Sequence, residues 1–586
     1  MTGPGTRLLP AKVGPVLRRH WLFITLVVLG VVVRGATIAA YGPALVTPDT
    51  LAYWTSAHNF EPQPLRPIGY SFFLAPVAAV TDSLTPVQVM QHSIGLLLAG
   101  GLYAFLLRRG LPAWGSALST APVLLDPLQI VLEHYVLTDV LFEGLLVLAC
   151  LLLLWRHRPH LWQIVAVGTL VGTAGLVRGA GTLLVVVFAL ALVCLRAGWS
   201  RILVFVVAAA IPVGAYMVAF HAEHGEYAVT TGGPRFLYAR LAPLVRCDDP
   251  QLRIPPYARQ LCPRIPVAER PSSNYYMWGQ RWGQVLPRDL PPGVTREEVL
   301  QDFDKQVVRA QPVVFAEASL KDFLAGFSPS RAYAAPGRDS AHWRFQEQYD
   351  QSGGRAWELL GQRGWDVEVN ESAARPLTLY GRWANLPGPL AGALAMAAVL
   401  AALGVGRSRW SGDRVAIGLL AGACLTTMVT GAALAGFSWR YQLPQLAMLP
   451  AAGALAVAAL ARGAVPGKPA PLPPLRILDR AASRLARVPM PQLWRRRASA
   501  WEERGVLAVA LGVLAGIATA AVVEVAAVQS GWFTPGTAAV GATVAGGLVS
   551  LVLLVSRRRA RSLPPRSGDG DAARPPAADS TLTGTY

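Results

Sequence analysis

The stretch that decides the fold is WLFITLVVLGVVVRGATIAAY, residues 21–41. Its length matches the roughly 20 apolar residues with which an α-helix crosses the hydrocarbon core of a bilayer. The run is too long for a cleaved signal peptide, and a Pro-rich stretch follows Tyr41 in place of a small-residue cleavage site. Residues 21–41 are therefore predicted to form a first membrane-spanning helix.

Similar apolar runs recur along the chain, and charge is scarce between them. Of the 586 residues, 53% are hydrophobic and 15% are charged, far less charge than a soluble protein of this size carries. The predicted fold class is an all-α polytopic membrane protein with about twelve transmembrane helices. The predicted spans are 21–41, 90–107, 113–131, 136–155, 161–177, 179–196, 201–220, 385–405, 413–436, 440–461, 505–528 and 536–556.

The net charge of +19 lies in short basic clusters at the ends of these runs, as at 156–158, 407–414 and 557–561. Basic residues beside a span mark cytoplasmic loops and attract anionic lipid, so the charge indicates topology and not nucleic-acid binding. With an even number of spans, both termini are predicted to lie in the cytoplasm. The expected location is the inner (plasma) membrane, multi-pass, with the active site facing outside.

This topology divides the chain into segments on the two sides of the membrane. The predicted organisation is a cytoplasmic N-terminus at 1–20, a transmembrane core at 21–220 with an outer loop at 42–89, an extracytoplasmic α or α+β domain at 221–384, further core helices at 385–462, a basic cytoplasmic interfacial segment at 463–503, two additional helices within 504–556 and a disordered cytoplasmic tail at 557–586.

Two cysteines, Cys247 and Cys262, lie in a polar loop of the predicted outer domain. Outside the cytoplasm such a pair could close a disulfide. Their spacing and the lack of histidine around them argue against zinc. No metal-ligand set is identified, and the sequence leaves open whether a divalent cation serves as a cofactor.

Six charged side chains are predicted to gather at the outer membrane face. They are Asp49, Glu133, Asp139, Arg66, Arg178 and Arg440. Ionisable residues at or within spans are costly and indicate function by default. Arginines suit a phosphate headgroup, and an acid beside them suits a general base. Two other interpretations remain, internal ion pairs that hold helices together and a helix cap at Asp49. Arg34, within the first span, could snorkel or pair with an acid.

Three motifs in this order resemble a known family. They are PDTLAYW (48–54) with Asp49 and Tyr53, RPIGYSFFLAP (66–76) with Arg66 and Tyr70, and WRYQLP (439–444) with Arg440 and Tyr441. Their order and topology resemble, across roughly residues 15–462, the lipid-carrier-dependent glycosyltransferases of the GT-C fold. That group contains protein O-mannosyltransferases, aminoarabinose transferases that modify lipid A, and actinobacterial arabinosyl- and mannosyltransferases. Many relatives carry two adjacent acids in the first loop, whereas Thr50 follows Asp49 here.

The resemblance implies a sugar donor on a polyprenyl phosphate and an extracytoplasmic glycan, lipid or protein acceptor. Asp49 would be the general base, and Asp139 or Glu133 would supply the second acid. The implied substrate-binding residues are Tyr53, Arg66, Tyr70, His134, Arg178, Arg440 and Tyr441. The domain at 221–384 would bind the acceptor, with the aromatics of SNYYMWGQRWGQ (273–284) stacking on sugar rings.

Arg outnumbers Lys, and Ala, Gly and Val dominate, a composition typical of a GC-rich actinobacterium. Decaprenyl-phosphate arabinose or mannose would then be the donor. The alternative function is a multi-helix transporter of an envelope precursor, whose acids would line a path through the bilayer. A binding or scaffold protein, the third possibility, needs no ionisable cluster.

The predicted topology is testable with a membrane-impermeant thiol reagent on single-cysteine variants. Ser83→Cys and Ser272→Cys should react in intact cells, because both positions are predicted to lie outside. Ser483→Cys should react only after the membrane is opened. Labelling of Ser483→Cys in intact cells would overturn the topology.

Overall fold

The computed structural model describes residues 13–156, 158–278, 290, 292–329, 331, 343–349, 351 and 355–462. Most of this part of the chain is helical. The first half contains α1 (Val13–Ala40), β1 (Tyr41–Gly42), α2 (Pro48–Asn59), α3 (Gly69–Ala78), α4 (Thr85–Arg108), α5 (Ala113–Leu125), α6 (Pro127–His134), α7 (Asp139–Leu154), α8 (Leu161–Val177), η1 (Gly179–Gly181), α9 (Leu184–Cys194) and α10 (Trp199–His224). The second half contains α11 (Gly233–Leu241), η2 (Pro256–Leu261), η3 (Val267–Glu269), α12 (Ser273–Trp278), α14 (Arg296–Ala310), α15 (Pro312–Ala325), α16 (Arg355–Gln362), β2 (Glu368–Val369), α17 (Glu371–Trp383), α18 (Gly388–Leu403), η4 (Gly406–Trp410), α19 (Arg414–Leu434), η5 (Trp439–Gln442) and α20 (Leu443–Arg462).

Five helices in the described residues are long and apolar enough to cross a membrane. They are Leu17–Ala40, Thr85–Arg108, Trp199–His224, Arg414–Leu434 and Trp439–Ala461. Two bent pairs, α5 with α6 at 46° and α17 with α18 at 50°, raise the number to seven if each pair is one span. The protein is therefore mostly helical and membrane-associated.

The predicted number of twelve spans is not reached in the described residues. The helices found at the predicted spans 136–155, 161–177 and 179–196 have 16, 17 and 11 residues. At about 1.5 Å of rise per residue, a 16-residue helix is about 24 Å long, shorter than the roughly 30 Å hydrocarbon core. The predicted segment 463–503, the helices 505–528 and 536–556, and the tail 557–586 lie outside the described residues.

The predicted span 113–131 is a broken helix, because the sequence Asp126-Pro127 interrupts it. The carboxylate of Asp126 accepts a hydrogen bond from the Leu128 backbone N–H at 2.9 Å and so caps α6. Pro127 opens α6 without a backbone N–H of its own. An apolar stretch long enough to cross a membrane thus divides into two helices.

The break leaves backbone carbonyls at the end of α5 without helical partners, and Arg34 of α1 supplies hydrogen bonds. Its Nη1 donates to Leu124 O at 2.8 Å and its Nη2 to Val123 O at 3.0 Å. The hydroxyl of Tyr380 on α17 donates to Leu125 O. Side chains from two other helices therefore satisfy a break that lipid could not.

The guanidinium of Arg34 also forms a bidentate ion pair with Glu133 of α6. Its Nε reaches Oε2 and its Nη2 reaches Oε1, both at 2.7 Å. The two side chains are 3% and 0% exposed, so the pair is buried. Gly95 of α4 makes room for it, since a Cβ there would lie 1.8 Å from Oε1 of Glu133. One buried pair therefore joins α1, α6 and the α5–α6 break.

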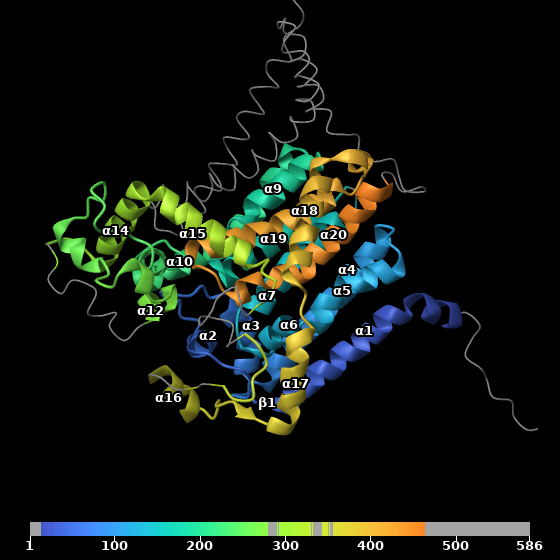
Figure 1. The fold of residues 1–586 in the computed structure, drawn as a ribbon, viewed down its shortest axis with the longest axis horizontal. Coiled ribbons are helices and arrows are strands. Elements are labelled where there is room, and N and C mark those ends of the chain that lie inside the picture. The colour runs from blue at the N-terminus through green and yellow to red at the C-terminus, as the bar shows by residue number, and fades with distance from the viewer. Residues whose placement is uncertain are drawn as a thin grey trace, which may run out of the picture.

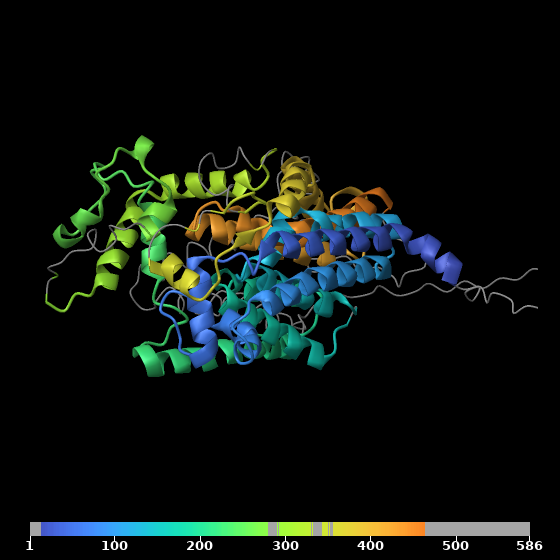
Figure 2. The ribbon, with the colours of Figure 1, turned by 90° about the horizontal axis from the view of Figure 1, so that it is seen from below.

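Figures 1 and 2 show α1, α4, α5, α18 and α20 running along one bundle, with α12 and α14 beyond one of its ends. Around α14, buried residues such as Tyr238 and Phe303 form a separate core, and Cys247 and Cys262 form a disulfide beside it. Residues 355–383 return to the bundle instead. There β2 pairs with β1, and Trp365 packs edge-on against Trp54 at 5.1 Å. The segment predicted as one outer domain, 221–384, thus contributes to two cores.

We expect Arg34→Met to destabilise the bundle by about 3–5 kcal/mol, the usual cost of leaving one partner of a buried ion pair alone. Thermal unfolding of the detergent-solubilised protein measures the loss. Arg19→Met is the matched control, because Arg19 is exposed on the same helix. Equal unfolding temperatures for the two variants would contradict a structural role for the Arg34–Glu133 pair.

Candidate functional site

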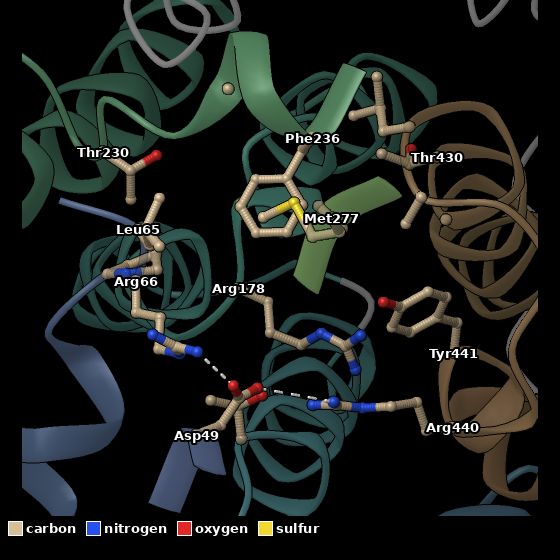
Figure 3. Close-up of a pocket in the computed structure, with 18 of the residues that line it drawn as sticks. Asp49, Leu65, Arg66, Arg178, Thr230, Phe236, Met277, Thr430, Arg440 and Tyr441 are labelled. Carbon is tan, nitrogen blue, oxygen red and sulfur yellow. Dashed lines mark hydrogen bonds and ion pairs between the residues drawn. The ribbon is translucent and has the colours of Figure 1, made fainter. Parts of the chain in front are cut away.

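A cavity of about 400 Å³ lies where the helix bundle meets α11 and α12 (Figure 3). Its walls are mainly apolar and come from both parts of the protein. The large apolar side chains on them are Phe142, Phe236, Leu237, Met277, Trp278, Leu434 and Tyr441. Four charged side chains also line the cavity: Asp49, Arg66, Arg178 and Arg440. The cavity thus combines an apolar wall with a small number of charged groups, as ligand-binding sites do.

Asp49 lies in the first turn of α2, which Thr47 begins as the N-cap residue. The Thr50 hydroxyl accepts the Thr47 backbone N–H at 3.0 Å and donates to Val136 O at 3.1 Å, which seats the helix start on the residues before α7. The Asp49 carboxylate is 26% exposed, and its Oδ1 accepts a hydrogen bond from Arg66. Asp49 therefore faces the cavity, and Thr47 and Thr50 cap the start of α2 instead.

Asp139 begins α7 behind the cavity wall and binds two arginines. Arg178, from the turn between α8 and η1, donates to its Oδ1. Arg440, from η5, reaches Oδ2 through Nη2 at 2.9 Å and Nε at 3.1 Å. The Asp139 side chain is 0% exposed. Its charge offsets the repulsion between two neighbouring guanidinium groups and fixes both of them at the cavity.

Arg440 links the two acids, because its Nη1 also lies 4.0 Å from Oδ2 of Asp49. The rings of Tyr441 and Trp343 lie under these cations. The centre of the Tyr441 ring is 4.8 Å from Cζ of Arg178, and that of Trp343 is 5.4 Å from Cζ of Arg440. Three guanidinium groups and two carboxylates leave one net positive charge at the cavity.

Tyr53 lines the same cavity from α2 and is almost fully buried. Its ring packs edge-on against Tyr70 at 5.2 Å. Burial, and after it the negative charge of Asp49, raises the pKa of the Tyr53 phenol. The hydroxyl therefore stays protonated and remains available as a neutral hydrogen-bond donor.

Three of the predicted site residues lie apart from this cluster. Glu133 pairs with Arg34 inside the bundle. Nε2 of His134 is buried and donates a hydrogen bond to Tyr41 O, 2.7 Å away. Tyr70 is buried behind Tyr53 and donates to Gln91 at 2.8 Å. Of the three predicted acids, Asp49 lines the cavity and Asp139 lies behind its wall, whereas Glu133 pairs with Arg34 inside the bundle.

Three further residues of α19 line the cavity and were not predicted from the sequence, Thr427, Thr430 and Gly431. Their signal is a row of small polar residues three or four positions apart in an apolar helix. Trp278, within the predicted aromatic stretch, does line the cavity, and Cζ of Arg66 lies 5.4 Å from its ring centre.

The residues of the site do not fit a divalent cation. Among the described residues, no three His, Cys, Asp or Glu side chains are grouped as metal ligands. Both carboxylates of the cluster are already bound to guanidinium groups, whose charge would repel a cation.

The chain matched no protein-family model, no curated protein and no solved structure when it was compared with them.

The two acids should differ in what they contribute to stability. Asp139→Asn should destabilise the protein by about 3–5 kcal/mol, because it leaves two guanidinium groups without their buried partner. Asp49→Asn should cost only about 1 kcal/mol, since its ion pair is partly exposed. Thermal unfolding in lipid nanodiscs measures both, with exposed Asp82→Asn as the control. Equal losses at positions 49 and 139 would contradict this division.

Proposed function

We propose that the protein is a membrane glycosyltransferase that moves a sugar from a polyprenyl-phosphate carrier to an acceptor outside the membrane. The observation that carries the proposal is the apolar-walled cavity on which three arginines and Asp49 meet. It lies between the membrane helices and α11–α12, where a lipid-borne substrate and a polar one could approach each other.

Phosphate binding is the first requirement, and the cations suit it. Each guanidinium carries five N–H donors, and the contacts to Asp49 and Asp139 use only some of them. The remaining donors of Arg66, Arg178 and Arg440 can bind phosphate oxygens. Held in place by carboxylates and rings, they would stabilise the charge that develops on a leaving phosphate without reorganising.

The general base is the second requirement, and Asp49 suits it better than Asp139. In the described part of the chain, Oδ2 of Asp49 accepts no hydrogen bond, and the carboxylate is partly exposed to the cavity. Both oxygens of Asp139 contact guanidinium groups, and its side chain is buried. Protonation of Asp139 would leave Arg178 and Arg440 without a counter-charge.

The proposed reaction is a single displacement. An acceptor hydroxyl gives its proton to Oδ2 of Asp49 while its oxygen attacks the anomeric carbon of the donor sugar. The bond from that carbon to the phosphate oxygen breaks, and the polyprenyl phosphate leaves with the bonding electron pair. Release of the proton from Asp49 to water then restores the carboxylate. The neutral Tyr53 hydroxyl can donate to a sugar oxygen beside it.

The acceptor is proposed to enter from the side of α11 and α12. Phe236 and Met277 lie on this wall of the cavity (Figure 3), and Trp278 also lines it. An indole or phenyl ring suits the apolar face of a sugar. An arabinose or mannose donor follows the resemblance noted above, and the cavity residues favour neither sugar.

We expect Asp49→Asn to fold and insert but to lower turnover by about 100-fold or more, the usual scale for losing a general base. The measurement is sugar transfer from synthetic polyprenyl-phosphate donors by purified protein. Asp82→Asn, an exposed acid in the same outer loop, should keep full turnover.

Near-normal turnover of Asp49→Asn, with loss of turnover in Asp139→Asn, would assign the base to Asp139. If no donor sugar is transferred while proteoliposomes carry an envelope precursor across the bilayer, the protein is a transporter and the proposal is wrong.

A further inference from the structure

A buried chain of hydrogen bonds lies inside the bundle, apart from the cavity. Oε2 of Glu133 is 2.8 Å from Nδ1 of His92 on α4. Nε2 of His92 is 3.2 Å from Nδ1 of His134 on α6, and Nε2 of His134 is 2.7 Å from Tyr41 O. Glu133 and His134 are 0% exposed and the His92 side chain is 5% exposed, so these contacts are shielded from solvent.

The number of protons in this chain follows from its two ends. A carboxylate and a backbone carbonyl are both acceptors and bring no proton. Three hydrogen bonds in series need three protons, and two neutral imidazoles supply one each. With all three bonds formed, the chain from Glu133 to Tyr41 holds one additional proton.

The surroundings place the additional proton on His92. Glu133 is kept as the anion by the two N–H donors of Arg34 and by Nε2 of Gln129 at 3.2 Å. His134 donates from Nε2 to Tyr41 O. Of the two rings, only His92 contacts the Glu133 carboxylate, whereas His134 contacts a backbone carbonyl and the other ring, so the positive charge is stabilised on His92 and His134 stays neutral. Nδ1 of His134 then accepts from His92. His92 must then donate from both ring nitrogens, which is the imidazolium form.

The hydrogen-bonded chain ends at Tyr41, which lies in the same segment as Asp49, the proposed general base. Tyr41 begins the segment 41–50, which contains Asp49. This segment pairs with the residues that lead to Asp139, through Leu45 N to His134 O at 3.2 Å and Val136 N to Leu45 O at 3.0 Å. A change at His134 therefore reaches the start of the Asp49 segment directly.

We propose that His92 is a positioning residue, held as an imidazolium, whose additional proton ties the segment 41–50 to the bundle. This inference rests on the proposed function only for its effect on catalysis. The proton and the tie exist whatever reaction the cavity performs. Without the proton one of the three hydrogen bonds is lost, and the Asp49 segment is held less firmly.

The charged and titratable groups near His92 come from the helices packed around it. Glu133 and His134 contact it from α6, and Arg34 of α1 shares Oε2 of Glu133 with it. Glu143 of α7 lies one step further, because Gln129 separates it from Glu133. Tyr70 of α3 bonds to Gln91, the neighbour of His92. Arg34 and Glu133 offset each other, so the charge of His92 depends on the geometry of Glu133.

The proton is tested with the full chain, labelled with ¹⁵N-histidine, in nanodiscs at about pH 8, where exposed histidines (pKa about 6.5) are neutral. The expected spectrum contains one imidazolium signal, which disappears in His92→Gln. An unchanged set of imidazolium signals in His92→Gln, or none in the wild type, would overturn the proposal.

Two glycine variants of α4 test whether the hydrogen-bonded chain from Glu133 to Tyr41 holds the segment 41–50. Gly95→Ala should displace Glu133, since its Cβ would lie 1.8 Å from Oε1, whereas Gly100→Ala meets no heavy atom within 4 Å and is the matched control. Gly95→Ala, but not Gly100→Ala, should lose the imidazolium signal and exchange the amides of 41–50 at least about tenfold faster. Its turnover should fall by about 10–100-fold with an unchanged donor KM.

Equal amide exchange of 41–50 in the two glycine variants would contradict the proposal that the His92 hydrogen bonds hold this segment. If Gly95→Ala does not fold, His92→Gln is compared with Gly100→Ala in the same way. If exchange differs while no variant or wild-type protein transfers sugar, the positioning inference stands and the proposed function fails.

Discussion

The Arg34–Glu133 pair is the interaction on which the rest of the structure depends. A helix broken inside a membrane protein exposes carbonyls that lipid cannot satisfy. Arg34 binds two of them and neutralises itself on Glu133, so the break and the ion pair stabilise each other. Neither partner is tolerable alone at this burial. The pair also keeps Glu133 out of the cavity, although Glu133 lies only six residues before Asp139 at the start of α7.

The same pair determines how the site is held. Glu133 anchors His92, and the segment after Tyr41 pairs with residues 134–136 that continue from Glu133. Asp49 and Asp139 thus sit at the ends of two paired segments, and Arg440 lies between their carboxylates. The separation of the two acids depends on backbone pairing and a buried charge rather than on the mobility of a surface loop.

Much of this could be predicted from the sequence, because apolar length and charge placement are local signals. The long helices α1, α4, α10, α19 and α20 fall within or close to predicted spans. Arg178 and Arg440 were predicted from their places at the ends of such runs, and Arg66 from its place in the first outer loop. Pairing of Arg34 with an acid was one of two predicted possibilities, but Glu133 as that acid was not predictable, since it lies 99 positions away and the contact depends on how α1 packs. The Asp126-Pro127 sequence is itself a signal for a helix break, but a prediction based only on the length of the apolar run missed it.

The division of labour between the two acids has a consequence for the proposed reaction. The three arginines and two carboxylates of the cluster carry one net positive charge, which matches the single negative charge of the proposed sugar phosphodiester donor. As the phosphate leaves, it gains up to one further negative charge. When Asp49 takes the proton of the acceptor, the cavity loses one negative charge at the same moment, and the three guanidinium groups then face a dianion with only Asp139 opposing them. Proton transfer and leaving-group stabilisation are thereby coupled, and this coupling needs Asp139 to stay ionised while Asp49 does not.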